Sequence, residues 1–318
     1  MPTNLLRSIL KRFTVSWKRR TALSFCFVAI SGRKTAHTFP EIALALVLLP
    51  WLWTAASAQA VSFPEFGSAI PGHMDVTYLD LARMVIPGLA GDSNGFYRGG
   101  LPIEMRHIEG PDGGGSPPET SGLSNAGVLA IKAGGKDRLA MLYDLGDSPD
   151  SAEGYAVLAL YDITDKPKLL DAVNVALDRG TYFREPGKLS VGPNDDIVIT
   201  MSAHFNSSQN YAITPLIMVR DDKFQLIDMI FTFDENLCAY SRKQDVAFQT
   251  IADGQPYAAV KVTVTDATVL NGESCDDQPP KPEAHTISVT YHWDKKTLHY
   301  VKDSDALDKL AGENAKRF

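Results

Sequence analysis

From Gly127 onward, short runs of alternating apolar and polar residues are separated by turn-forming residues. Alternation with a period of two places one set of side chains on each face of a strand, so this pattern predicts β-structure rather than helices. Residues 127–173 resemble residues 187–230 in the positions of a leading glycine, a Tyr-Ala pair and a closing Leu-Leu-Asp or Leu-Ile-Asp. Each stretch contains four strand-like runs, which predicts a repeated four-stranded antiparallel sheet.

A third stretch also contains four strand-like runs, so the copies cover about 127–177, 187–233 and 244–301. Repeats of four antiparallel strands are typical of β-propeller blades, although closed propellers have four to eight of them. We therefore expect a mainly β domain over residues 127–318. It is built either as a partial β-propeller-like array or as a β-sandwich.

The last hairpin allows a register to be predicted. A two-residue turn at Lys295-Lys296 would pair Trp293 with Leu298 and place His292 directly opposite His299. The face that belongs to the core then carries Val289, Tyr291, Trp293, Leu298 and Tyr300. The opposite face is expected to be wet and carries Ser288, Thr290, His292 and His299.

Residues 61–126 are rich in Gly and Pro and form an N-terminal segment with one expected helix. Asp75 is positioned to cap a helix from Val76 to Ile86, and Pro87-Gly88 provides the stop. The run from Gly113 to Pro118 predicts a loop or linker.

The C-terminal residues 303–316 predict a second short helix. Its apolar positions, Leu307 and Leu310, recur at helical spacing, so we expect them to face inward.

Residues 1–60 predict a secretory signal peptide. An unbroken apolar run, Ile42–Leu49, follows basic residues and precedes Ser57-Ala58-Gln59-Ala60, which fits an A-x-A cleavage site. A transmembrane anchor is the alternative, but a span needs about 20 apolar residues, and this run is broken by Pro50. We expect cleavage after Ala60, no membrane span afterwards, and a periplasmic or secreted mature chain.

The 318 residues are 44% apolar and 22% charged, which is sufficient for a sizeable core. The net charge of −7 is unevenly distributed, because residues 1–60 hold eight Lys/Arg and one acid. Residues 61–318 therefore hold 23 Lys/Arg against 37 Asp/Glu, a balance of −14. Such a body repels phosphate backbones, which argues against nucleic acid, and favours a cationic envelope protein or ligand.

Of the three cysteines, Cys26 leaves with the leader, so the mature chain keeps Cys238 and Cys275. A lone pair in an oxidising compartment usually forms a disulfide, and two free thiols are the alternative. No C-x-x-C is present, so a redox or zinc role loses its best signal.

Residues 91–95, Gly-Asp-Ser-Asn-Gly, match G-x-S-x-G, in which Ser93 would be the nucleophile of a hydrolase. That motif needs a helix directly after it, and the Gly-rich residues up to Pro102 do not favour one. A chance match in a Gly-rich loop is the alternative.

Two metal sites are candidates. His292 and His299 would suit zinc or copper, although a third ligand is not visible locally. A cluster of carboxylates in the first copy would suit calcium, although its spacing matches no EF-hand and solvated acidic loops are common. These carboxylates are Asp144, Asp147, Asp150 and Glu153. No other cofactor is expected.

The equivalent loop of the second copy begins His204-Phe205-Asn206 and continues with hydroxyl and amide side chains. An aromatic ring among such groups is typical of a binding loop, and an ordinary polar turn is the alternative.

Two functions are consistent with these features. The first is an exported, non-catalytic binding or accessory protein of the bacterial cell envelope, favoured because every catalytic motif is incomplete. The second is a periplasmic hydrolase, which would be serine-dependent through Ser93 or metal-dependent through His292 and His299.

Overall fold

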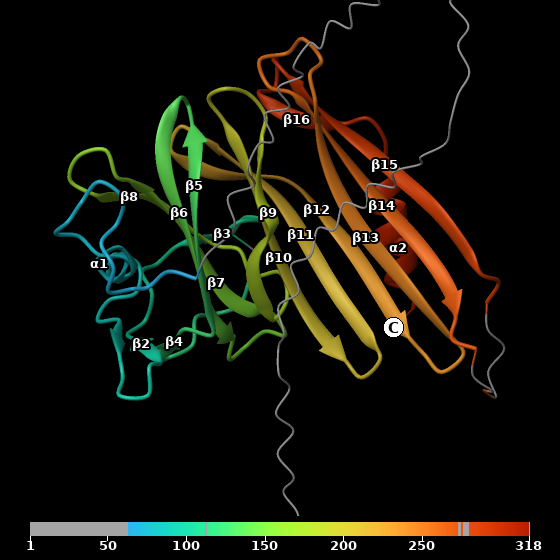
Figure 1. The fold of residues 1–318 in the computed structure, drawn as a ribbon, viewed down its shortest axis with the longest axis horizontal. Helices are drawn as coiled ribbons and strands as arrows, with labels where there is room; N and C mark the ends of the chain where they lie inside the picture. Colours follow the sequence, from blue (N-terminus) through green and yellow to red (C-terminus); the bar gives the residue numbers. More distant parts are fainter. Residues whose placement is uncertain (1–62, 112, 273–274, 276–279, 318) are drawn as a thin grey trace, which may run out of the picture. The chain divides into compact units, whose positions relative to one another are not determined.

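The computed structural model describes residues 63–111, 113–272, 275 and 280–317, which form two short helices and three β-sheets (Figure 1). The predicted mainly β fold with two short helices is confirmed. The predicted leader, residues 1–60, lies outside the described residues. Within the described part of the chain, no sheet closes on itself, and no helix is long and apolar enough to cross a membrane.

The elements have the following bounds. The helices are α1 (Tyr78–Arg83) and α2 (Ala306–Asn314). The three-stranded sheet contains β1 (Ala90–Gly91), β2 (Tyr97–Gly99) and β4 (Ser121–Gly122). The five-stranded sheet contains β3 (Arg106–His107), β5 (Asn125–Ala133), β6 (Lys136–Asp147), β7 (Gly154–Asp162) and β8 (Lys168–Asn174). The eight-stranded sheet contains β9 (Gly180–Ser190), β10 (Asp196–Asn206), β11 (Gln209–Arg220), β12 (Lys223–Asn236), β13 (Tyr240–Ile251), β14 (Ala259–Leu270), β15 (Glu283–Asp294) and β16 (His299–Lys302).

Four strands lie in each of the three predicted copies. The first copy supplies β5–β8, an antiparallel meander to which β3 adds a short parallel pairing at β8. The second and third copies supply β9–β12 and β13–β16, and these join in one eight-stranded meander. The twelve strands of the copies are therefore divided between two sheets rather than three.

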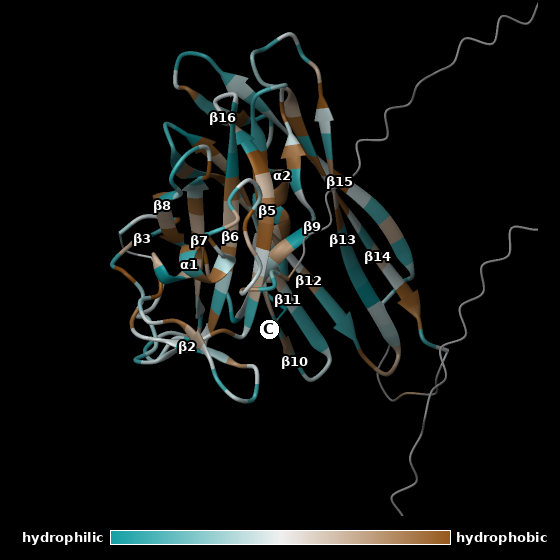
Figure 2. Cartoon of the chain, turned by 60° about the vertical axis from the view of Figure 1, so that its left-hand side comes forward, coloured by the Kyte–Doolittle hydropathy of each residue, from teal (hydrophilic) through white to brown (hydrophobic). Residues whose placement is uncertain are grey.

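Strand β6 is buried on both of its faces. Ala140 and Leu142 belong to an apolar cluster that also contains Val198 and Ile217 of the eight-stranded sheet. Met141 points into a second cluster, which contains residues of α1. Because strand side chains alternate between faces, a strand covered on both sides reads as a continuous apolar run. The brown bands along β6 and β7 in Figure 2 reflect this.

The two central strands of the eight-stranded sheet, β12 and β13, pair over a short stretch only. Strands β12 and β13 pair at Glu235↔Arg242 and Asn236↔Ser241, beside their connecting turn, whereas β13 and β14 pair along their full length. The two halves of the sheet share a third apolar cluster, to which α2 contributes Leu307 and Leu310. The inward direction predicted for these two leucines is confirmed.

Helix α1 begins later than the sequence predicted. Thr77, not Asp75, is its N-cap, because the Thr77 hydroxyl accepts a hydrogen bond from the Asp80 backbone amide. The Asp80 carboxylate in turn accepts from the Thr77 amide at 2.9 Å, which completes a capping box. The helix ends at Arg83, before the predicted stop.

The predicted register of the last hairpin is wrong, because the turn between its strands is two residues longer than predicted. Trp293 pairs with Tyr300, and Asp294 pairs with His299. Residues 295–298 form the turn, in which Leu298 has a φ of 57° and is 46% exposed instead of lying in the core. The other predicted core residues are buried, and these are Val289, Tyr291, Trp293 and Tyr300. On the opposite face, Ser288, His292 and His299 are exposed as predicted.

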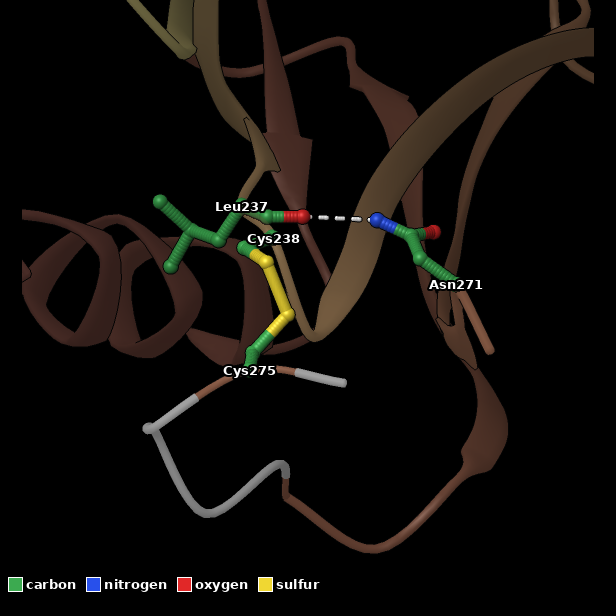
Figure 3. The surroundings of a disulfide bond; sticks show 4 residues. All are labelled: Leu237, Cys238, Asn271 and Cys275. Carbon is green, nitrogen blue, oxygen red and sulfur yellow. Dashed lines mark hydrogen bonds between the residues drawn. A yellow bond between two sulfur atoms is a disulfide. The ribbon is translucent and has the colours of Figure 1, made fainter. Parts of the chain in front are cut away.

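The predicted disulfide is confirmed. Cys238 and Cys275 are bonded, with their Cα atoms 6.1 Å apart (Figure 3). The bond ties the connection between β14 and β15 to the turn between β12 and β13. Beside it, the side-chain amide of Asn271 donates to the Leu237 carbonyl at 2.6 Å, so this turn is held from two sides.

Candidate functional site

The predicted binding loop is the tip of the β10–β11 hairpin. Asn206 pairs with Gln209, so Ser207 and Ser208 form a two-residue turn, and Ser207 has a φ of 53°. Strand alternation sends neighbouring residues of β10 to opposite faces of the sheet. His204 and Phe205, which are adjacent in sequence, therefore belong to two different cross-strand rows.

The outward row contains Phe205, Asn210 and Asp234, which are register partners across β10, β11 and β12. It lies in a groove of about 570 Å³ between the tip of the β10–β11 hairpin and the β12–β13 turn. This volume lies within the usual range of small-molecule sites. The groove, here called the hairpin groove, is lined by Phe205, Ser207, Ser208, Gln209, Asn210, Asp234, Glu235, Asn236, Ser241, Arg242 and Lys243.

The basic side chains of the hairpin groove are already paired. Arg242 makes two hydrogen bonds to the buried carboxylate of Asp266, and these raise the pKa of the guanidinium. Lys243 lies 2.7 Å from Asp245, and this contact raises the pKa of its ammonium group. Neither cation is therefore available to a bound anion without the loss of an existing contact.

The acidic side chains of the groove are paired as well. Glu235 forms an ion pair with Arg317. Asp234 accepts hydrogen bonds from the Gln244 backbone amide at 2.8 Å and from the Asn210 side-chain amide at 3.4 Å. Asp234 is thus held by neutral amides and forms no ion pair within the described residues.

The unpaired polar groups of the site are neutral. Within the described residues, the side chains of Ser207 and Ser208 make no hydrogen bond, and the Asn210 Oδ1 atom is buried without a partner. The Asn210 amide orientation follows from its neighbour, because Nδ2 donates to the Asp234 carboxylate and an oxygen there would be repelled. The Phe205 ring, 80% exposed, stands beside these groups.

The inward row contains His204, Tyr211 and Phe233, again register partners on three strands. The His204 and Tyr211 rings stack with their centroids 4.5 Å apart and 8° between their planes. Both carboxylate oxygens of Asp178 lie within 2.7 Å of His204 Nδ1. His204 is therefore held from behind the groove, and of the three predicted binding residues Phe205 is the one that lines it.

The acidic loop of the first copy lies next to this His–Asp pair. The backbone carbonyl of Asp178 accepts from the Gly154 amide at 3.0 Å, and Asp144 accepts from the Thr181 amide at 3.2 Å. The candidate loops of the first and second copies are thus brought together, which the sequence had not indicated. Asp178 was missed because it lies between two copies and matches no motif.

The four carboxylates predicted to hold calcium face different partners. Burial raises the pKa of Asp144, whereas hydrogen bonds from Ser116 and Ser148 lower the pKa of Asp150 to about 2. Within the described residues, no group of three His, Cys, Asp or Glu side chains is placed to hold a metal ion. The calcium site, which also included Asp147 and Glu153, stays a prediction without a ligand set.

The two histidines of the last hairpin are diagonal neighbours rather than direct partners. His292 pairs with Val301, two residues after His299, so both imidazoles lie on one face. Diagonal neighbours on a sheet are about 7–8 Å apart at the backbone. His292 is instead hydrogen-bonded to Asp253 at 3.1 Å, and His299 lies opposite Asp294. The predicted direct opposition is wrong because of the longer turn.

Ser93 lies in the β1–β2 hairpin. The Asp92 carboxylate accepts from the backbone amides of Asn94 and Phe96 at 2.8 and 3.0 Å, and this arrangement folds the loop. Strand β2 follows, where a nucleophile elbow requires a helix. Within the described residues, Ser93 makes no hydrogen bond to a histidine.

No family model matches this chain, and neither a curated protein nor a solved structure matches it.

Proposed function

We propose that this chain is an exported, non-catalytic binding or accessory protein of the bacterial cell envelope, and that its hairpin groove binds a neutral polyhydroxyl ligand such as a glycan. The observation that carries the proposal is the exposed Phe205 ring beside the unpaired hydroxyl groups of Ser207 and Ser208. Sugar rings present apolar C–H faces to an aromatic ring, while their hydroxyl groups both donate and accept hydrogen bonds.

The paired charges of the groove favour a neutral ligand. A charged ligand would have to compete with the existing partners of Arg242, Lys243 or Glu235, and Asp234 already accepts two hydrogen bonds. Separating the two partly buried pairs, Arg242–Asp266 and Glu235–Arg317, costs free energy, since each ion left behind loses its partner, whereas the exposed Lys243–Asp245 pair contributes little. A glycan would instead use the Ser207 and Ser208 hydroxyl groups, which line the groove and make no hydrogen bond within the described residues.

A cationic partner remains a proposal for the surface outside the groove. The balance of −14 over residues 61–318 attracts cations over long distances, and this attraction weakens as salt is added. Binding that disappears between low and high salt would favour such a partner. Salt-independent binding would favour the neutral ligand.

The second candidate function is a periplasmic hydrolase. His204 and Asp178 resemble the base and the orienting carboxylate of a catalytic triad. No serine, threonine or cysteine in the described residues is hydrogen-bonded to His204, which supports the non-catalytic proposal. Labelling of Ser93 by a fluorophosphonate, or hydrolytic activity lost on chelation, would favour the hydrolase.

The proposal includes a location outside the cytoplasm and a β-sandwich-like architecture. The periplasmic or secreted location depends on the leader sequence, and a disulfide is compatible with it. The apolar cluster shared by the five- and eight-stranded sheets favours a β-sandwich-like arrangement over separate propeller blades.

Calorimetric titration of the mature protein tests the proposed function. The ligands are neutral oligosaccharides, chitotetraose, maltotetraose and cellotetraose, each at low and at high salt. We expect saturable, salt-insensitive binding of at least one of them. Absence of binding to all three, with spermine binding only at low salt, would overturn the groove proposal in favour of a cationic partner.

A further inference from the structure

A second cavity, of about 320 Å³, lies where the glycine-rich segment 113–117, here called the strap, crosses one edge of the five-stranded sheet. It is independent of the hairpin groove. At this edge β3 pairs with β8, so that His107 and Asn174 are register partners. The cavity, here called the strap pocket, is bounded by these two residues, by Tyr155, and by apolar side chains that include Leu101, Ile103 and Met105.

Asn174 is 3% exposed, and only one of the two polar atoms of its side chain is hydrogen-bonded within the described residues. Its Oδ1 atom accepts from the backbone amides of Ala156 and Ala176 at 3.2 and 3.1 Å. Because two N–H donors converge on this atom, it must be the oxygen, and the other amide atom is Nδ2. Within the described residues, Nδ2 donates no hydrogen bond, although Asn174 lines the pocket.

Tyr155 provides a second polar group that lines the pocket without a hydrogen-bond partner among the described residues. Its side chain is 5% exposed and lines the pocket, and its hydroxyl makes no hydrogen bond within the part of the chain that the structure describes. Neither polar atom is fully enclosed by protein, so each has contact with the pocket and is free to pair with a molecule that occupies it.

The glycines of the strap keep this space open. A Cβ atom on Gly113 would lie 2.3 Å from His107 Nδ1, and one on Gly114 would lie 2.9 Å from Asn174 Nδ2. Gly114 also has a φ of +78°, which side chains disfavour. The strap thus approaches the imidazole and the amide through backbone alone, and a side chain on Gly114 would fill the place next to Nδ2.

We propose that the strap pocket binds a small neutral molecule that joins a carbonyl oxygen to a short aliphatic group. The carbonyl accepts hydrogen bonds from Asn174 Nδ2 and the Tyr155 hydroxyl, and the aliphatic group packs against Leu101, Ile103 and Met105. An anion is disfavoured because the described lining contains Glu104 and neither lysine nor arginine. The volume is at the small end of ligand sites, which favours a small molecule over a polymer.

The test is a titration of the isotope-labelled, exported protein with isovaleramide, followed through the Asn174 side-chain amide signals by NMR. These signals are assigned by their disappearance in Asn174→Asp. We expect a saturable shift of the Asn174 signals and about tenfold weaker binding in Tyr155→Phe. Isovalerate, which has the same aliphatic group and a negative charge, should bind more weakly.

The matched control is Tyr182→Phe, which removes the hydroxyl of a partly exposed tyrosine on β9. It should bind isovaleramide as the parent protein does. The proposal is overturned if no saturable shift occurs, which would indicate that the pocket holds water only. It is also overturned if Tyr155→Phe retains both its fold, judged by its other amide signals, and its full affinity.

Discussion

The imidazole of His204 is anchored by Asp178, whose two carboxylate oxygens lie 2.6 and 2.7 Å from Nδ1. Asp178 precedes the first strand of the second four-stranded unit, and His204 lies near the end of the next strand. The pair therefore fixes the connection between β8 and β9 against the β10–β11 hairpin. It also holds the ring stacked on Tyr211, behind the hairpin groove. His204 is thus a positioning residue, and Phe205 lines the groove.

Removal of the imidazole should destabilise the fold. His204→Ala leaves the Asp178 carboxylate without its partner, and we expect a loss of about 1–2 kcal/mol in the free energy of unfolding, because the pair is partly exposed. Urea denaturation measures it. His299→Ala, which truncates an exposed histidine, should change stability by less than about 0.5 kcal/mol. Equal stability of the two variants would contradict the anchoring role.

Arg138→Ala should lower the free energy of unfolding more than His204→Ala does. It is almost fully buried and lies 3.1 Å from Asp162 and 3.0 Å from Asp222, which belongs to the β11–β12 turn. Arg138→Ala leaves Asp222 unpaired and leaves Asp162 with Lys168 at 3.8 Å, and we expect a loss of about 2–4 kcal/mol. The control is Arg98→Ala, an exposed arginine 3.9 Å from Asp92, with an expected loss below about 0.5 kcal/mol. Similar losses in both variants would contradict this account.

The disulfide should stabilise the mature chain through the loop that it closes. Cys238 and Cys275 are 37 residues apart in sequence, and the chain-entropy model gives about 4 kcal/mol for a loop of this length. We expect Cys238→Ser with Cys275→Ser to lose about 2–4 kcal/mol in denaturant unfolding. Reduction of the parent protein should lower stability by a similar amount. A loss below about 1 kcal/mol would show that the bond contributes little.

Acid should weaken the fold through Asp150. Hydrogen bonds from Ser116 and Ser148 hold its pKa at about 2, below the ordinary 3.8, so the folded chain binds this proton less readily than the unfolded chain. The resulting stability is complete above the ordinary pKa and is lost as the pH falls through the folded value. Between about pH 4 and pH 2, stability should therefore fall more in the parent protein than in Asp150→Asn.

Ser148→Ala tests the cause of the low Asp150 pKa. This variant removes one donor, so its acid loss should lie between those of the parent protein and Asp150→Asn. Thermal unfolding measured across this pH range provides the comparison. Identical pH profiles for all three proteins would contradict the assignment.

The strands could be predicted because period-two alternation is a local property of the sequence, and the turns between them carry Asp, Gly and Lys. The register of the last hairpin could not, since Leu298 adopts a left-handed conformation that lengthens the turn, and leucine gives no signal for it. The capping box at Thr77 was readable, because a threonine followed three residues later by an acid is its signature.

The sites depended on longer-range geometry. Phe205 was predicted as a binding residue from its polar neighbours, but the groove also requires the β12–β13 turn, which pairing across three strands brings alongside. The sequence around Asp178 and Asn174 does not indicate a site, because the partners of these two residues are brought to them by the folding of the connections between strands. Sequence patterns therefore located one wall of the hairpin groove and none of the strap pocket.

The most direct test of the groove compares two exposed phenylalanines. Phe205 is 80% exposed and lines the hairpin groove, whereas Phe96 is 60% exposed in the β1–β2 hairpin. The measurement is the affinity of Phe205→Ala and Phe96→Ala for the oligosaccharide that the parent protein binds. The account predicts at least a tenfold loss for Phe205→Ala and an unchanged affinity for Phe96→Ala. Equal affinity of both variants and the parent protein would contradict it.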